Sequence, residues 1–139
     1  MKTFELIGPA LDWAVAKILD LNYRTKEKDD LSKHIVVLTP IACPDKKSGC
    51  AVAHFKIDYF SPSTDWSQGG PIIERECIAT YASGSCSVTP KNPDYWVAEI
   101  LDTEEMITQY GPTPLIAAMR CYCASKFGDE VEIPSELQP

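Results

Sequence analysis

The residues best suited to chemistry lie together in one segment, residues 59–76. It contains hydroxyl, amide, carboxylate and guanidinium side chains beside a tryptophan, with two prolines and a Gly-Gly pair. The prolines and glycines predict a loop, and polar groups beside an aromatic face are typical of pockets that orient a small polar ligand. We therefore predict a ligand-binding loop over residues 61–75. Its candidate binding residues are Ser61, Ser63, Thr64, Asp65, Trp66, Gln68, Gly69, Gly70 and Arg75.

Several of these residues also have a purely structural interpretation. Trp66 is either a packed aromatic residue or a stacking platform, and Ser63 and Asp65 either cap a turn or contact the ligand. Gly69 and Gly70 either supply a turn with positive φ or let main-chain amides approach a phosphate or carboxylate closely. The sequence leaves these alternatives open.

Two further candidates belong to the last predicted helix. Arg120 lies in the middle of a largely apolar element, so it either pairs with a carboxylate or forks onto a phosphate or carboxylate in the pocket. The carboxylates considered as its partners are Asp65, Asp12 and Glu74. Thr113 either only caps the helix or marks an N-terminus whose amides meet an anion.

The sequence contains no recognisable catalytic motif. Neither Gly-x-Ser-x-Gly nor His-Glu-x-x-His occurs, and there is neither a Walker motif nor a dinucleotide fingerprint. We therefore predict a non-catalytic protein without a cofactor or metal. The less favoured alternative is a nucleotide hydrolase that holds a divalent ion with Asp65 and Glu74. Arg75, between two glutamates, is expected to be a solvated strand residue with a local partner.

Six cysteines and two histidines raise the question of a zinc site. The set to consider is His34, Cys43, Cys50 and His54, which fall within 21 positions. Structural zinc sites usually contain a tight Cys-x2-4-Cys knuckle, whereas six residues separate these two cysteines. We therefore interpret the cysteines as reduced thiols.

The apolar pattern predicts the strands and helices that position the segment. Strands are predicted over 34–39, 51–60, 77–81 and 95–100, the first two paired as a hairpin, and 22–33 is predicted to be a polar loop. Helices are predicted over 8–21 and from Thr113, as N-cap, to Gly128 after the last turn. The prediction is a single α+β domain over 1–128, with two main helices on a small, mostly antiparallel sheet, followed by an acidic tail over 129–139.

Charge and hydropathy exclude several classes of partner. The net charge is −7 and no basic stripe is present, which argues against binding to a nucleic-acid polymer. No apolar run approaches the roughly 20 residues that cross a bilayer, and the first residues do not resemble a signal peptide. We expect a cytosolic protein without a membrane partner.

Four segments resemble the NinX-like accessory proteins of tailed phages: GPALDWAVA (8–16), residues 59–76, GPTPLIAAMR (111–120) and KFGDEVEIP (126–134). The resemblance implies a phage protein that acts in the cytoplasm of the host bacterium, where small accessory proteins often alter host physiology or blunt host defence. The chain departs from the family pattern at Cys77, where glycine is expected in a tight turn, and over 22–58, which looks longer and different.

These observations predict a phage accessory protein that binds and sequesters a small polar ligand. A nucleotide-derived immune signal of the host fits the polar loop, and a homo-oligomer with the pocket at a subunit interface is expected. The alternative is a protein-binding module that blocks a host factor through the same loop; exposed Trp66 and Trp96 would favour it.

Overall fold

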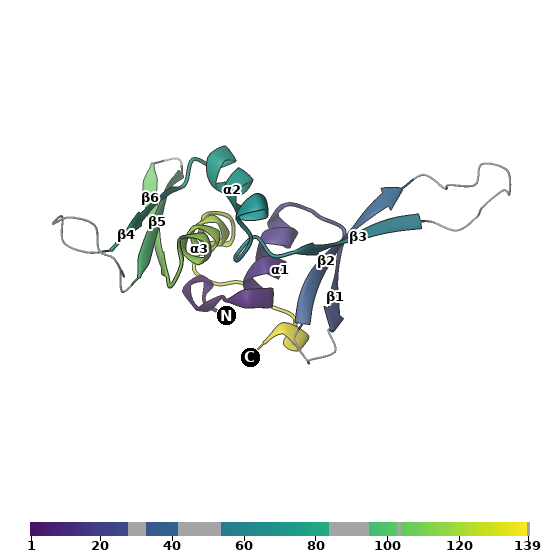
Figure 1. The fold of residues 1–139 in the computed structure, drawn as a ribbon. Helices are drawn as coiled ribbons and strands as arrows, with labels where there is room; N and C mark the ends of the chain where they lie inside the picture. The colour runs from purple at the N-terminus through teal and green to yellow at the C-terminus, as the bar shows by residue number, and fades with distance from the viewer. Residues whose placement is uncertain (28–32, 42–53, 84–94, 103, 139) are drawn as a thin grey trace, which may run out of the picture.

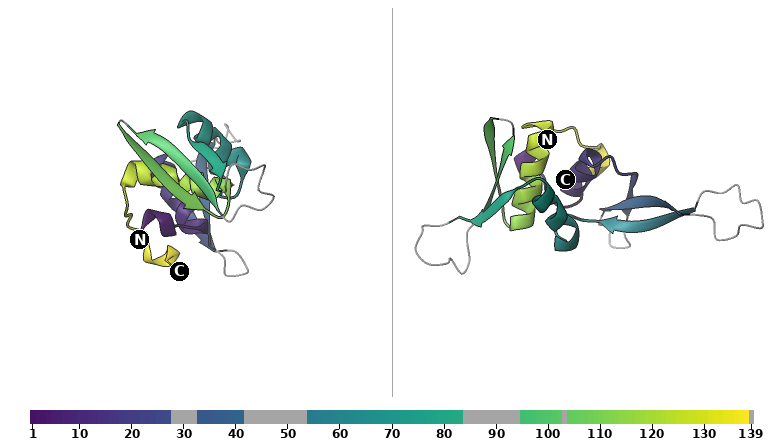
Figure 2. Two further views of the ribbon diagram at one scale, coloured as in Figure 1. Left: turned by 90° about the vertical axis from the view of Figure 1, so that its left-hand side faces the viewer. Right: turned by 90° about the horizontal axis from the view of Figure 1, so that it is seen from above.

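The computed structural model describes residues 1–27, 33–41, 54–83, 95–102 and 104–138. The helices lie in the middle of the molecule, and a three-stranded antiparallel sheet lies on either side (Figures 1 and 2). One sheet contains, in spatial order, β1 (Tyr23–Glu27), β2 (Lys33–Ile41) and β3 (His54–Phe60); the other contains β4 (Ala79–Ala82), β5 (Trp96–Asp102) and β6 (Glu105–Gly111). The helices are α1 (Gly8–Ile18), α2 (Trp66–Arg75) and α3 (Pro114–Phe127), with 3-10 turns η1 (Thr3–Glu5) and η2 (Ser135–Leu137). The predicted α+β class is confirmed, although the strands form two small sheets and a third helix is present.

Helix α3 is the centre of the core, and its ends follow the local signals in the sequence. The Thr113 hydroxyl accepts a hydrogen bond from the Ile116 amide (3.2 Å), and Gly128 follows the last turn with φ +79°. The helix is buried on most sides because it packs against α1, α2 and all three strands of the β4–β6 sheet. At Gly111 the chain enters α3 so closely that an added Cβ would lie 2.6 Å from the Ala117 nitrogen.

The predicted loop over 61–75 is wrong, because residues 66–75 form helix α2. Asp65 is the N-cap: its Oδ1 accepts hydrogen bonds from the Ser67 amide (2.8 Å) and hydroxyl (2.7 Å). Pro71 lies inside the helix, and neither Gly69 nor Gly70 has positive φ. The proline and glycines that indicate a turn in the sequence are therefore accommodated within a helix.

The turn after α2 is tight even though a cysteine occupies its critical position. Cys77 has φ +53°, and its amide donates to the Glu74 carbonyl (3.3 Å) while the Ile78 amide donates to the Ile73 carbonyl (3.0 Å). This pair of bonds is the Schellman arrangement, in which glycine is the usual residue at the left-handed position. The departure from the family pattern at Cys77 thus leaves the turn intact.

The remaining differences concern polar segments. Strand β1 lies within the predicted polar loop over 22–33, and β6 has no counterpart in the prediction; β2, β3, β4 and β5 match predicted strands, and β2 pairs with β3 as expected. The tail is tied to the N-terminus, since the Thr3 amide donates to the Asp129 carbonyl (2.9 Å). It also contributes three buried side chains to the core, those of Val131, Ile133 and Leu137.

Candidate ligand-binding groove

The polar residues just before α2 and in its first turn form hydrogen bonds that hold the chain at the start of that helix. Gln68 accepts a hydrogen bond from the Ser61 amide (2.9 Å) and donates to Asp65 Oδ2 (3.1 Å) and to the Tyr59 carbonyl (3.1 Å). The Thr64 hydroxyl donates to the Ser61 carbonyl (3.4 Å). Hydrogen bonds from Ser67 hold the pKa of Asp65 below its usual range. These polar groups therefore have a structural role in the fold.

Ser63 fastens the same segment to α1. It is buried, and its amide donates to Oδ1 of Asp12 (3.0 Å), which is also buried. The Ser63 hydroxyl has no hydrogen-bond partner among the described residues. Burial raises the pKa of the Asp12 carboxyl to about 6, against the lowering effect of the Ser63 hydrogen bond.

Arg120 binds other parts of the chain, and Thr113 caps α3. The Arg120 guanidinium donates from Nε to the Leu6 carbonyl (2.8 Å) and from NH1 to the Tyr110 carbonyl (2.7 Å), so it joins the segment before α1 to the end of β6. In the described part of the chain, the Arg120 guanidinium has no carboxylate partner. Burial lowers the pKa of this guanidinium. The two hollows lined by residues of the 61–75 segment, one by Gln68 and Arg75 and the other by Ser61, do not include Arg120.

A groove of about 590 Å³ lies between α2, the end of α1 and the β2–β3 hairpin. Its lining residues are Leu19, Leu21, Val37, Asp58, Tyr59, Phe60, Gln68, Pro71, Ile72 and Arg75. Only Gln68 and Arg75 come from the predicted set of site residues. Of the others, Pro71 and Ile72 lie in the segment predicted as a loop, and the rest belong to the two predicted strands and the first predicted helix. The prediction therefore included the segment that forms α2 but not the surfaces that face it.

The groove combines an apolar floor with charged groups at its edge. Arg75 is exposed at the end of α2, where Nε donates to Glu76 Oε1 (2.9 Å) and NH2 to the Tyr122 hydroxyl (3.5 Å). Its local partner was predicted correctly, but it lies on a helix and not on a strand. Asp58 forms an ion pair with Lys56 (3.1 Å). The Tyr59 ring lies on the opposite face of β3, where it packs edge-on against His34 with ring centroids 5.7 Å apart. Arginine suits an anion, and an apolar floor suits the apolar part of a small ligand.

Trp66 and the glycines do not contribute to this groove. Trp66 is the first residue of α2 and is 55% exposed, but it is not among the lining residues. A Cβ added at Gly69 would lie 2.4 Å from the Pro62 carbonyl oxygen and 2.6 Å from Leu115 Cδ2, while at Gly70 nothing lies within 4 Å. Gly69 is therefore needed for close packing of α2 against the preceding turn and α3.

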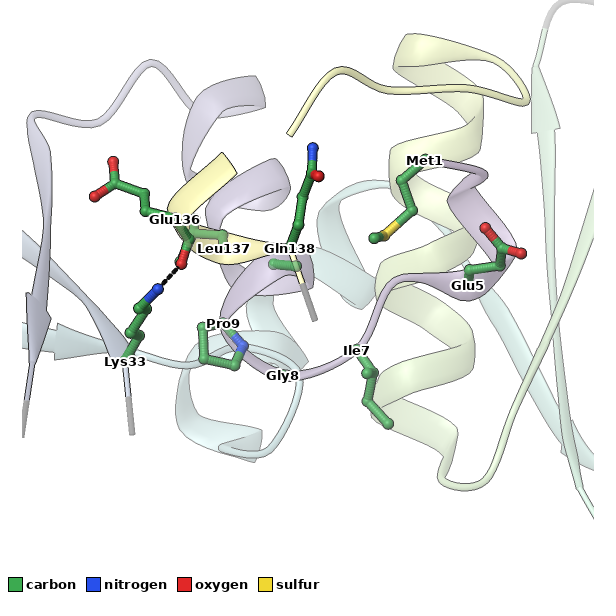
Figure 3. A pocket seen from close by; sticks show the side chains of 10 residues that line it. Met1, Glu5, Ile7, Gly8, Pro9, Lys33, Glu136, Leu137 and Gln138 are labelled. Carbon is green, nitrogen blue, oxygen red and sulfur yellow. Dashed lines mark hydrogen bonds between the residues drawn. The ribbon is translucent and has the colours of Figure 1, made fainter. Parts of the chain in front are cut away.

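A second hollow, of about 400 Å³, lies between the two ends of the chain (Figure 3). Its polar side chains bind other parts of the protein: Lys33 donates to the Glu136 carbonyl, Gln138 to the Ile133 carbonyl (3.1 Å), and Glu5 accepts from the Lys2 amide (3.3 Å). None of the predicted binding residues lines it.

Two candidate metal sets are separated by the fold. His34 lies near the start of β2, whereas His54 pairs with Ile41 at the other end of that strand, about 23 Å away at 3.3 Å per residue. Asp65 and Glu74 lie nine positions apart along α2, or about 13 Å at 1.5 Å per residue. Neither pair can bind a single ion. Cys43 and Cys50 lie outside the described residues.

The comparison with protein families covers most of the chain. A family model described as Bacteriophage P22, NinX matches residues 2–126. The chain belongs to the NinX family. The match spans all three helices and both sheets and includes residues 22–58, but it ends before most of the fourth segment of resemblance. No match was found among curated proteins. Among the described residues of this NinX-family protein, no helix has the length and apolar character needed to cross a membrane.

Proposed function

We propose that this NinX-family protein binds and sequesters a small polar ligand in the groove between α2 and the β2–β3 hairpin. The observation that carries the proposal is the combination of Arg75 and Asp58 beside an apolar floor. At about 590 Å³ the groove falls within the usual range for small-molecule sites.

A nucleotide-derived ligand fits these groups. The Arg75 guanidinium binds a phosphate, the apolar floor contacts a base, and the Asp58 carboxylate accepts hydrogen bonds from an exocyclic amine or a ribose hydroxyl. NH1 of Arg75 has no protein partner among the described residues, which leaves donors for an anion. A phage protein that holds such a molecule without converting it lowers the free concentration of a host immune signal.

The test is isothermal titration calorimetry with nucleoside monophosphates, diphosphates and cyclic dinucleotides, followed by mass spectrometry of the released ligand. We expect one of these to bind stoichiometrically and to be released unchanged. Arg75→Ala should weaken its binding at least about tenfold, because a charge-assisted pair to phosphate is lost. Arg24→Ala is the matched control, since Arg24 is exposed on β1 outside the groove. Absence of binding by the unaltered protein, or equal loss in both variants, would contradict the proposal.

A protein-binding function is the second candidate, favoured by tyrosines on the outer face of the β4–β6 sheet. Tyr81 and Tyr110 flank Val97 on the face away from α3, and the Tyr95 and Tyr110 rings are 5.6 Å apart. All three tyrosines are about half exposed, and tyrosine is enriched in protein interfaces. Trp66 is exposed as well, but Trp96 is partly buried against the core.

Pull-down from host lysate tests the protein-binding candidate. A partner bound through the tyrosines is retained by Arg75→Ala and lost from Tyr110→Ser. A partner retained by both variants, or none, would contradict it.

A further inference from the structure

Strand β3 has a free edge. It is the last strand of the β1–β2–β3 sheet, and in the described part of the chain no strand pairs with its other side. The β2–β3 hairpin projects away from the helices (Figures 1 and 2). Phe55, Ile57 and Tyr59 alternate along β3 and are 42%, 57% and 56% exposed. An exposed apolar edge of this kind is a template for pairing with another strand.

The hydrogen-bonding groups of Phe55, Ile57 and Tyr59 point to the free side. The Leu38 amide donates to the Asn22 carbonyl (2.7 Å), so the even-numbered residues of β2 bond toward β1 and the odd-numbered residues toward β3. The odd residue Val37 is paired with Asp58, which therefore bonds inward, and its neighbours on β3 bond outward. In agreement, the Tyr59 carbonyl accepts a hydrogen bond from the Gln68 side chain of α2 and not from β2.

We propose that β3 pairs antiparallel with β3 of a second copy of this chain, about a two-fold axis at Ile57. In this register Ile57 faces Ile57 of the second copy, and the two exchange main-chain hydrogen bonds. Phe55 faces Tyr59 of the second copy on one side of the sheet. On the other side, Lys56 faces Asp58 of the second copy, and the reverse contact is generated by the symmetry. The interface is self-complementary in both charge and shape, as a two-fold interface requires.

Neighbouring registers are disfavoured by charge. Because opposed residues must both bond outward or both bond inward, the axis can only move by whole residues along the strand. An axis at position 56 places Lys56 opposite itself, and an axis at position 58 places Asp58 opposite itself. Like charges directly opposite each other destabilise a strand pair, whereas opposite charges stabilise it. The axis at Ile57 is thus the register that the sequence selects.

The pairing is compatible with the contacts that β3 already makes. The Tyr59 carbonyl oxygen has two lone pairs and can accept from both Gln68 and a second strand. Lys56 and Asp58 are 66% and 53% exposed as side chains, so exchanging their present ion pair for two pairs across the axis requires no repacking of the core. Three exposed apolar side chains per copy become neighbours across the interface.

Charge-swap variants test the register independently of any ligand. Sedimentation equilibrium should show that the unaltered protein forms a dimer at protein concentrations of about 100 µM or below, which corresponds to a weak specific complex. Lys56→Asp and Asp58→Lys should each weaken the dimer at least about tenfold, because each places like charges opposite each other twice. An equimolar mixture of the two variants should recover a heterodimer, since both charged pairs across the axis then join opposite charges.

The control is Glu132→Lys, an exposed charge change outside β3 that should leave the dimer unchanged. Circular dichroism establishes that each variant is folded. A monomeric unaltered protein at 100 µM, single variants that remain dimeric, or a mixture that remains monomeric would each overturn the proposal.

Discussion

Replacing Asp12 by asparagine should stabilise the protein near neutral pH. Asp12 lies on α1, is only 6% exposed, and has no cationic partner among the described residues. A buried carboxylate in this position is favoured in its protonated form, and its pKa is accordingly raised from 3.8 to about 6. Asparagine has the same shape and no charge. Its Oδ1 can accept the Ser63 amide, so the hydrogen bond that holds this segment to α1 is kept.

The direction of the pH dependence follows from the raised pKa. The folded protein binds the Asp12 proton more tightly than the unfolded chain does, so this carboxyl contributes stability below about pH 3.8, and the contribution is lost as the pH rises through about 6. At about 1.4 kcal/mol per pH unit, the interval from 3.8 to about 6 amounts to a loss of about 3 kcal/mol. Asp12→Asn should match the unaltered protein near pH 4 and exceed its free energy of unfolding by about 1–3 kcal/mol at pH 7–8.

Urea denaturation at a series of pH values from 4 to 8 measures this difference. Subtracting the two free energies of unfolding removes the titration of the other carboxylates, which both proteins share. Asp129→Asn is the matched control, because it makes the same chemical change at an exposed side chain. A difference that does not vary with pH, or a variant less stable at every pH, would refute the argument that Asp12 is destabilised by burial.

Further predictions concern stability within α2 and at the turn that follows it. Gly69→Ala should lower the free energy of unfolding by about 1–3 kcal/mol, because the added Cβ would overlap Pro62 and Leu115. Gly70→Ala should be neutral or stabilising by up to about 1 kcal/mol, because nothing lies within 4 Å of the added Cβ. Thermal unfolding of both variants measures the two changes, and equal effects of the two substitutions would contradict the prediction. Cys77→Gly should raise the free energy of unfolding by about 0.5–1 kcal/mol, because glycine adopts the left-handed conformation of this position without strain. Urea denaturation measures the change, and a variant less stable than the unaltered protein would show that the turn is not strained.

Local signals in the sequence were sufficient for α3 and insufficient for α2. The cap residue Thr113 and the terminal Gly128 act within one turn of the chain, so they could be identified without knowledge of the fold. In α2 the glycine at position 69 is required by neighbours that the sequence does not identify, Pro62 and Leu115. The spacing of Asp65 and Gln68, which matches an N-cap and its third helical residue, was the signal that could have revealed the helix.

The missed strands have a similar cause. Strand β1 is polar and lies at the edge of its sheet, so it lacks the apolar pattern by which a buried strand is recognised. The groove escaped prediction because its lining comes from separate segments, of which only Gln68 and Arg75 were candidates. A cluster of polar residues close together in sequence indicated a site, but most of that polarity satisfies the cap of α2.

Two of the groups that line the groove connect it to the free edge of β3. Asp58 and Tyr59 line the groove and also lie on the strand proposed to pair with a second copy. In that pairing Lys56 of the second copy faces Asp58, which brings a positive charge to the edge of the groove in a chain of net charge −7. A phosphate bound by Arg75 would then have a second cation nearby, so dimer formation and anion binding would favour each other. The same change, Asp58→Lys, separates the two effects: it removes the dimer by like-charge repulsion but increases the positive charge of the groove within one copy.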